Sequence, residues 1–323
     1  MRKKERTVKF KEKSVVNKIF MIVVCVVLCV YALSIITPLV WGIITSLKSN
    51  LDFTVGANVI GFPNLDKSVK WNSRAEFLQL ANYKVVLSEF EFDKTVTFYI
   101  GDTLVQHKSH NDFFAMLFNT LLIAGLGAFL QTIVPLIMGY ACAKYPFKYS
   151  NVLFAIALLA MVMPVVGAYP SEITLLRNLG VYDTIFGFIF QKCYFGGMYF
   201  FVFYGFYKSL PDSYCEAAEI DGASQFRCLT MIILPLTIKM IGTIWLIQFV
   251  HFWNDYTTPL LYMPTYPTLA YGVWFLTFGS NQSLTKLPYR VAGAMTLALP
   301  ILILFIFLKD KLMGNITMGG LKQ

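Results

Sequence analysis

Long apolar runs without a single charge dominate the chain. Three of them are charge-free over their whole length, and they lie between Lys18 and Lys48, between Asp112 and Lys144, and between Lys148 and Glu172. An α-helix rises about 1.5 Å per residue, so about 20 apolar residues cross the roughly 30 Å hydrocarbon core of a bilayer. Each run is long enough, and each predicts a membrane-spanning helix.

Three further apolar runs are shorter or carry one charge. Residues 184–207 contain Lys192, residues 240–263 contain Asp255, and residues 291–308 are uncharged. Together with the first three runs they predict six transmembrane helices. The predicted fold class is an all-α membrane protein, with a short cytoplasmic helix and a small extracytoplasmic insertion added to the six spans.

Prolines predict interruptions in two of these spans. Pro135 lies inside the second run, and Pro164 and Pro170 lie late in the third. A proline removes one helical hydrogen bond, and in a membrane a neighbouring group must satisfy the freed carbonyl. Such breaks occur where helices bend around a transport path, and they also occur as simple kinks. The sequence leaves both explanations open.

Basic residues set the predicted orientation. Residues 1–18 carry eight basic and two acidic residues directly before the first apolar run. Basic flanks stay in the cytoplasm, and six spans bring residues 309–323 back to the same side. Residues 216–235 then lie in the cytoplasm, and residues 49–112 lie outside. Much of the formal net charge of +9 follows from this topology, so we expect contact with membrane lipid and no nucleic-acid partner.

The outer segment 49–112 is long for a connection between two spans. Residues 71–87 space their apolar side chains as a short amphipathic helix does. Residues 94–107 alternate around Gly101 and Asp102 in the manner of a β-hairpin. We expect an insertion that packs on the outer face. A disordered loop is the alternative, and the aromatic residues of the segment argue against it.

The chain lacks the residues of an ATPase or a metal site. No glycine is followed by lysine anywhere, so the Gly-x-x-x-x-Gly-Lys phosphate loop is missing. ATP must bind another polypeptide, and we expect no enzymatic activity and no cofactor here. His107 and His110 have no evident third metal ligand. The six cysteines lie mostly in or beside the apolar runs, which does not suggest a disulfide framework.

The segment 216–235, EAAEIDGASQFRCLTMIILP, is polar and lies between two apolar runs. Ser213 can cap a helix that starts at Tyr214, with Glu216 at the third position of a capping box. Acidic residues suit the first turn of a helix, and Gly222 allows a turn or a close approach. These residues predict a short helix on the cytoplasmic surface. An ordinary interfacial helix and a docking element both fit.

The spacing in this segment resembles a known signature. The matching positions are Glu216, Ala217, Ala218, then Gly222 after three residues, then Ile232, Ile233, Leu234 and Pro235 after nine more. They are similar to the EAA signature of the permease subunits of bacterial ABC importers. In that family the signature forms a coupling helix, which sits in a cleft of a separate ATPase subunit.

The resemblance implies a role for each position of the signature. Glu216 is expected to form an ion pair with a basic residue of the ATPase. Ala217, Ala218 and Gly222 would give a close packing surface, and Asp221 occupies a variable position beside them. ATP and Mg²⁺ would bind on the partner ATPase.

The resemblance covers roughly residues 113–323. Segments such as LRNLGVYDTIFGFIF and HFWNDYTTPLLY are similar to those of carbohydrate permeases. The tail, which contains Gly319 and Gly320, resembles the C-terminus of the maltose-transport-type inner subunit, which reaches towards the ATPase dimer. Two features depart from the family. The insertion 49–112 is longer than usual, and the tail ends in GGLKQ where GAVKG is more typical.

Polar residues inside an apolar run are candidates for the transport path. Asp255 lies in the fifth run beside Trp253, Asn254 and Tyr256. Carboxylates, amides and aromatic rings suit sugars, because rings stack and hydroxyls need paired acceptors. The alternative is that Asn254 and Asp255 cap a helix break before Pro259. Lys192 is expected to snorkel to the outer interface.

These observations predict one permease subunit of an ABC importer in a bacterial inner membrane, with both termini cytoplasmic. The resemblance favours a carbohydrate substrate, and it implies a second, non-identical permease, an ATPase dimer and an external solute-binding protein. An importer of a non-sugar solute is the alternative. A secondary transporter would carry more buried charge and often a visible repeat. The expected organisation is a basic segment 1–18, a first span 19–48, an insertion 49–112, a transmembrane domain 113–308 and a tail 309–323.

Overall fold

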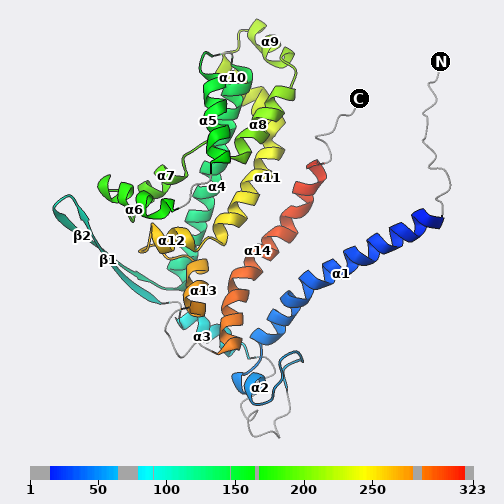
Figure 1. Ribbon diagram of the computed structural model, residues 1–323, viewed down its shortest axis with the longest axis vertical. Coiled ribbons are helices and arrows are strands. Elements are labelled where there is room, and N and C mark those ends of the chain that lie inside the picture. Colours follow the sequence, from blue (N-terminus) through cyan, green and yellow to red (C-terminus); the bar gives the residue numbers. More distant parts are fainter. Residues whose placement is uncertain are drawn as a thin grey trace. The chain divides into compact units, whose positions relative to one another are not determined.

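The computed structural model describes residues 15–64, 79–89, 91–145, 147–163, 167–278 and 286–316, and these are mostly helical (Figure 1). The elements in chain order are α1 (Val15–Ser46), α2 (Asn50–Thr54), α3 (Ala81–Glu89), β1 (Phe92–Ile100), β2 (Thr103–Asn111), α4 (Phe113–Lys144), α5 (Ser150–Val162), α6 (Ala168–Asn178), α7 (Ile185–Lys192), α8 (Met198–Ser209), α9 (Ser213–Ile220), α10 (Gln225–Cys228), the π-helix η2 (Leu229–Ile233), α11 (Leu234–Trp253), α12 (Thr257–Leu261), α13 (Leu269–Phe278) and α14 (Leu287–Ile316).

Four helices in the described part of the chain are long and apolar enough to cross a membrane. They are Asn17–Ser46 within α1, Phe113–Lys144 as α4, Gln225–Trp253 through α10, η2 and α11, and Leu287–Phe307 within α14. The first, second and sixth predicted spans are therefore present as continuous helices. Pro135 does not end α4, which continues through it.

The third and fourth predicted runs are not continuous helices. The third is divided into α5 and α6, and Gly167 before α6 adopts a left-handed backbone with φ of 74°. The fourth is divided into α7 and α8 by residues 193–197, which include Gly196 and Gly197. At about 1.5 Å per residue, neither α5 nor α8 reaches the roughly 30 Å of a bilayer core as a helix alone. Pro164 lies outside the described residues.

The fifth predicted span begins earlier and ends earlier than its apolar run suggests. Helix starts at Gln225, inside the polar segment, and continues through η2 and α11 to Trp253. Pro235 stands in the first turn of α11. A proline cannot donate its backbone hydrogen bond and crowds the preceding turn, and the wider π-turn directly before it relieves that crowding.

The chain divides into two compact units. Unit 1 comprises Met1–Asn82 and Lys286–Met295. Within it, Lys48 is fully buried after the end of α1, and its ammonium donates to the carbonyl oxygens of Asn58 at 2.8 Å and Val59 at 3.2 Å. The carboxylate of Asp52 in α2 accepts from the Asn58 amide at 3.2 Å. These contacts fold residues 49–64 into a compact turn.

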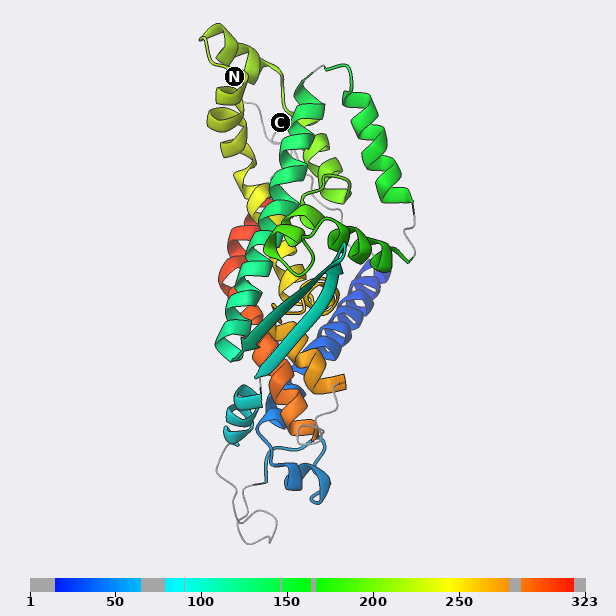
Figure 2. The ribbon, with the colours of Figure 1, turned by 90° about the vertical axis from the view of Figure 1, so that its left-hand side faces the viewer.

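Unit 2 comprises Tyr83–Thr285 and Thr296–Gln323 and contains the predicted hairpin. Strands β1 and β2 pair antiparallel, and Ile100 faces Thr103 across the turn. Gly101 adopts a left-handed φ of 58°, which confirms the expected turn. The neighbouring amphipathic helix is seen as α3, and residues 65–78 lie outside the described part. The hairpin runs beside α6 (Figure 2).

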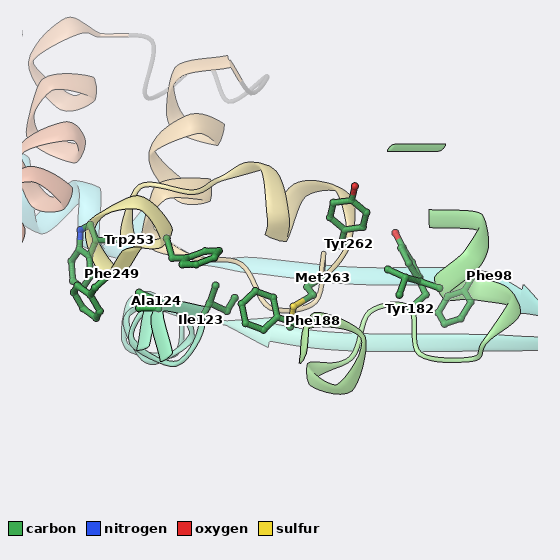
Figure 3. Packing of buried hydrophobic residues seen from close by; sticks show 12 residues of the cluster. Phe98, Ile123, Ala124, Tyr182, Phe188, Phe249, Trp253, Tyr262 and Met263 are labelled. Carbon is green, nitrogen blue, oxygen red and sulfur yellow. The ribbon is translucent and has the colours of Figure 1, made fainter. Parts of the chain in front are cut away.

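One apolar cluster ties the hairpin to the helices of unit 2. Its buried side chains come from β1, α4, α6, α7, α11, the connection between α6 and α7, and the segment after α12 (Figure 3). They are Phe98, Ile123, Ala124, Ala128, Leu176, Tyr182, Phe188, Phe249, Phe252, Trp253, Tyr262 and Met263. The packing is dense enough that a Cβ on Gly127 would meet the Phe252 ring at 2.8 Å. The hairpin is thereby a packed part of unit 2.

Candidate functional site

The segment with the EAA-like signature folds as two short helices joined by a tight turn. Gly222 has a φ of 76°, a left-handed conformation that favours glycine. The N–H of Gly222 donates to the Glu219 carbonyl at 3.0 Å, and the N–H of Ala223 donates to the Ala218 carbonyl at 2.8 Å. This is the Schellman pattern that ends a helix. Ser224 then caps α10 by accepting from the Arg227 N–H. The signature glycine is therefore required by the turn.

The predicted capping box at the start of α9 is not formed. Helix begins at Ser213, and no side chain caps it. The preceding residue, Asp212, instead accepts from the Lys144 ammonium at 2.6 Å. Lys144 also donates to the Leu210 carbonyl at 2.6 Å. The hydrogen bond and charge of Lys144 hold the pKa of Asp212 below its usual range. An ion pair to α4 thus takes the place of the expected cap.

The inner side of α9 packs on this chain's own core. Ala218 is buried beside Cys228 and Ile233. The sulfur atoms of Cys215 on α9 and Cys228 on α10 lie 2.7 Å apart, and all six cysteines are free. Ala218 therefore contributes packing inside the chain, where the resemblance suggested an outward surface. The α9–α10 hairpin is seated firmly on α4, α8 and η2.

The outer side of the α9–α10 hairpin carries the other signature residues. Glu216, Ala217, Asp221 and Gly222 are all exposed. Within the described residues, no hydrogen bond or ion pair engages the carboxylate of Glu216 or of Asp221. The next acid along, Glu219, is held by the side-chain amide of Gln225. Glu216 is therefore available to a partner, and Glu219 is already engaged.

Two apolar side chains at this tip were missed by the sequence reasoning. Ile220 is 86% exposed and Phe226 is 74% exposed, one on each side of the Gly222 turn. Apolar side chains that are exposed within a polar segment are candidates for a protein contact. Ile220 and Phe226 lie two and four residues from Gly222, so both can be found in the sequence. They did not stand out because the apolar runs on either side of the segment are much more hydrophobic.

Asp255 caps a helix, as one of the two sequence explanations expected. Its carboxylate accepts from the N–H groups of Thr257 at 2.8 Å and Thr258 at 3.0 Å, and from the Thr258 hydroxyl at 2.5 Å. These contacts fix the first turn of α12, which contains Pro259. The carboxylate is satisfied within the chain.

The neighbours of Asp255 lie in different surroundings. Trp253 is buried, and its indole N–H donates to the Leu297 carbonyl at 3.1 Å. Asn254 is exposed and donates to the Val250 carbonyl. Tyr256 is 41% exposed and stacks on Trp274, with ring centroids 6.0 Å apart. The structure therefore does not bring these four residues together as one surface.

The other candidate residues are the tail glycines and the two histidines of the β-hairpin. Gly319 and Gly320 lie outside the described residues. His107 contacts the buried carboxylate of Asp183 at 3.0 Å, and His110 contacts Asp93 at 2.9 Å. Within the described residues, no group of three or more His, Cys, Asp or Glu side chains is placed to hold a metal ion.

Residues 132–316 match the family model described as the binding-protein-dependent transport system inner membrane component. A maltodextrin transport system permease protein of Streptococcus pneumoniae is 32% identical over 207 residues, which cover 62% of this chain and 72% of that protein. An arabinooligosaccharides transport system permease protein of Bacillus subtilis is 26% identical over 214 residues, covering 65% of this chain and 74% of that protein.

A solved structure shares the fold. The crystal structure of a bacterial ABC transporter involved in the import of the acidic polysaccharide alginate contains a chain with a TM-score of 0.68 and 21% identity. The match covers 92% of this chain and 98% of that one. The family match spans more than half of the sequence and includes α8 to α11, with the EAA-like segment between them. The chain therefore belongs to the family of binding-protein-dependent transport system inner membrane components.

Proposed function

We propose that this chain is the permease subunit of an ABC importer and forms half of a transmembrane path for a carbohydrate. The observation that carries the proposal is the similarity over more than 200 residues to permeases named for maltodextrin and for arabinooligosaccharides. Both relatives are named for oligosaccharides, so we infer an oligosaccharide substrate. The chain itself is not an enzyme in this proposal, and ATP with Mg²⁺ acts on a separate ATPase.

The proposed partners follow from the same role. A second, non-identical permease completes the path, an ATPase dimer supplies energy, and an external solute-binding protein delivers the sugar. The chain lies in a bacterial inner membrane with both termini cytoplasmic. We place six crossings in it: the four long helices, α5 and α8. The described residues 193–197 before α8 would help to complete that crossing inside the protein, where other chain segments can satisfy their backbone groups.

We propose that the α9–α10 hairpin couples the ATPase to the path. Glu216 is exposed and has no hydrogen-bond or ion-pair partner among the described residues, so it can form an ion pair with a basic residue of the ATPase. Ile220 and Phe226 would anchor the contact in an apolar cleft, and the small Ala217 and Gly222 would let the surfaces approach. The tail residues Gly319 and Gly320 would reach towards the same subunit.

The packing of this hairpin supports such a role. Its backbone is closed by the Schellman turn at Gly222, its inner side packs through Ala218, and an ion pair from Lys144 holds its start. ATP-driven closure of the ATPase dimer would move the hairpin as one body. Because α10 continues through η2 into α11, that movement would pass directly to a membrane-spanning helix.

Uptake into vesicles tests the proposal. Membranes that contain this chain with its second permease and ATPase should accumulate labelled maltodextrin or arabino-oligosaccharide when ATP and the binding protein are supplied. The same vesicles without ATP are the control. Accumulation of a non-sugar solute with no uptake of either saccharide would favour the alternative, an importer of another solute class.

A further inference from the structure

A polar cluster lies where α6, α7 and the segment after α12 meet. Glu172 of α6 accepts the Tyr262 hydroxyl at 2.5 Å, and the same carboxylate oxygen accepts the Gln191 side-chain amide at 3.1 Å. Lys192 follows Gln191 at the end of α7. Tyr262 belongs to the apolar cluster, and its hydroxyl points away from Phe188 (Figure 3). Residues 90 positions apart in the sequence are thus joined at one place.

Several polar groups in this cluster have no partner among the described residues. The side-chain carbonyl oxygen of Gln191 is buried and accepts no hydrogen bond. The second carboxylate oxygen of Glu172 is not engaged, and the Lys192 ammonium makes no hydrogen bond or ion pair there. Glu172, Gln191 and Lys192 are all half-buried. Unmet polar groups sheltered from water are costly, so a ligand or an ordered water is needed to satisfy them.

The position of Lys192 limits the chemistry of that ligand. Its ammonium lies 6.0 Å from the Phe188 ring centroid and 5.6 Å from that of Phe252. The charges that act on it are the carboxylates of Asp255 and Glu172, at more than the 4.0 Å of an ion pair. An acidic ligand at this place would add a third negative charge to two carboxylates and one ammonium, so like-charge repulsion disfavours it.

A neutral sugar satisfies all the unpaired groups. A sugar hydroxyl both donates and accepts a hydrogen bond, so neighbouring hydroxyls can donate to Glu172 and Gln191 and accept from Lys192. Tyr169 on α6 is 55% exposed, and its ring centroid lies 6.4 Å from that of Tyr262. An exposed tyrosine face beside hydrogen-bonding groups suits the apolar face of a pyranose ring.

We propose that Glu172, Gln191 and Lys192, together with Tyr169, form a binding surface for the hydroxyl groups of a neutral saccharide on the transport path. This inference rests on the proposed function and adds the residues by which this subunit contacts the sugar. Glu172 is the central residue, because it both holds Tyr262 in place and presents a free oxygen. Asp255 stays outside the surface as the cap of α12.

The alternative explanation is mechanical. The contacts of Glu172 to Gln191 and Tyr262 would then only brace α6 and α7 against the segment after α12. A brace and a sugar contact differ in one measurable respect. Loss of a brace reduces uptake of every sugar by a similar factor, whereas loss of a sugar contact changes the Michaelis constant and the preference between sugars.

The test compares Glu172→Gln and Lys192→Met with the wild type in vesicles. Glu172→Gln keeps the shape and one hydrogen bond but removes the charge, and Lys192→Met keeps the length of the side chain. Asp102→Asn, at the exposed turn of the β-hairpin, is the matched control. We expect KM for the saccharide to rise about tenfold in either variant. We also expect the uptake ratio between two saccharides that differ in one hydroxyl to change, with Asp102→Asn unchanged.

Each outcome decides the matter. Uptake in the variants that falls equally for all sugars, with a lower unfolding temperature of the complex, supports the brace and overturns the sugar contact. Wild-type kinetics in both variants also overturns it while leaving the proposed function intact. No saccharide uptake by the wild type contradicts the proposed function and this inference together.

Discussion

The two ends of the helical run that contains α10, η2 and α11 differ in where they leave their polar groups. Helix runs from Gln225 to Trp253 over 29 residues, about 43 Å. At its first end, the α9–α10 hairpin closes its own backbone, and the exposed carboxylates of Glu216 and Asp221 have no partner among the described residues. At its last end, the Asp255 carboxylate accepts hydrogen bonds from Thr257 and Thr258. The Glu172 carboxylate accepts from Tyr262 and Gln191. The Gln191 side-chain carbonyl, which has no partner among the described residues, is buried.

The two ends therefore suit different kinds of partner. An exposed carboxylate is solvated at little cost, so its lack of a partner is compatible with a docking surface that is open in the free subunit. A sheltered oxygen without a hydrogen bond is costly and requires a small ligand or water that can reach it. A macromolecular partner therefore fits the Glu216 end, and a small polar solute fits the Glu172 end.

The largest expected effect is at Glu216. Replacing it with alanine should remove a charge-assisted contact worth about 1.5–3 kcal/mol, which weakens ATPase binding roughly 10- to 100-fold. Glu219→Ala is the matched control, because Glu219 is already held by Gln225. For each variant, co-purification of the ATPase measures binding, and uptake into vesicles measures transport. An equal loss in both variants would show that the free carboxylate of Glu216 is not what the ATPase recognises.

The next effect is at Gly222. Gly222→Val should destabilise the hairpin by about 1–2 kcal/mol, because a residue with a Cβ resists the left-handed conformation. Nothing lies within 4 Å of the added Cβ, so the effect comes from the backbone alone. Hydrogen exchange of the α9 amides measures it. Gly242→Ala on α11, where a Cβ also meets no neighbour, should leave exchange in α9 unchanged.

At the other end, Asp255→Ala should remove the cap of α12 and cost about 0.5–2 kcal/mol. Thr258→Val removes only the hydroxyl contact and should cost less. Thermal unfolding of the solubilised subunit measures both. A changed sugar preference with unaltered unfolding would instead return Asp255 to the transport path.

The cysteine pair tests whether the hairpin moves as one body. Diamide should join Cys215 and Cys228, since their sulfur atoms lie 2.7 Å apart; it takes up the two thiol hydrogens as the S–S bond forms. If α9 and α10 keep their contact throughout transport, the cross-linked protein should retain its uptake rate. The Cys215→Ser variant is the control for oxidation elsewhere. Uptake that stops on cross-linking and returns with a thiol reductant would show that α9 moves relative to α10.

The smallest expected effect is the pH dependence of the Asp212–Lys144 pair. The hydrogen bond and charge of Lys144 lower the pKa of Asp212 from its usual value of 3.8. The ion pair between Asp212 and Lys144 therefore contributes to stability above pH 3.8, and this contribution is lost as pH falls through the lowered pKa of Asp212. Asp212 is exposed, so the change should be slight. Unfolding curves of the wild type and Asp212→Asn should converge at acid pH; a difference that persists there would require another cause.

The elements that depend on neighbouring residues could be predicted from the sequence alone. Uncharged runs long enough to cross a bilayer predicted α1, α4 and α14. The alternation of residues around Gly101 predicted the β-hairpin of β1 and β2. The spacing around Gly222 predicted the short helix α9 and the turn after it. Each of these rests on a local property, either hydrophobic length or a backbone conformation open to glycine.

The places where long apolar runs are interrupted, and the contacts of the polar residues inside them, depend on how separate helices pack. The apolar run between residues 148 and 172 predicts one helix, because hydrophobicity alone does not indicate the left-handed backbone conformation of Gly167. The capping role of Asp255 depends on Thr258, and the junction of Glu172 with Tyr262 joins residues 90 positions apart. Such pairs form only when separate helices pack, and no local spacing contains them.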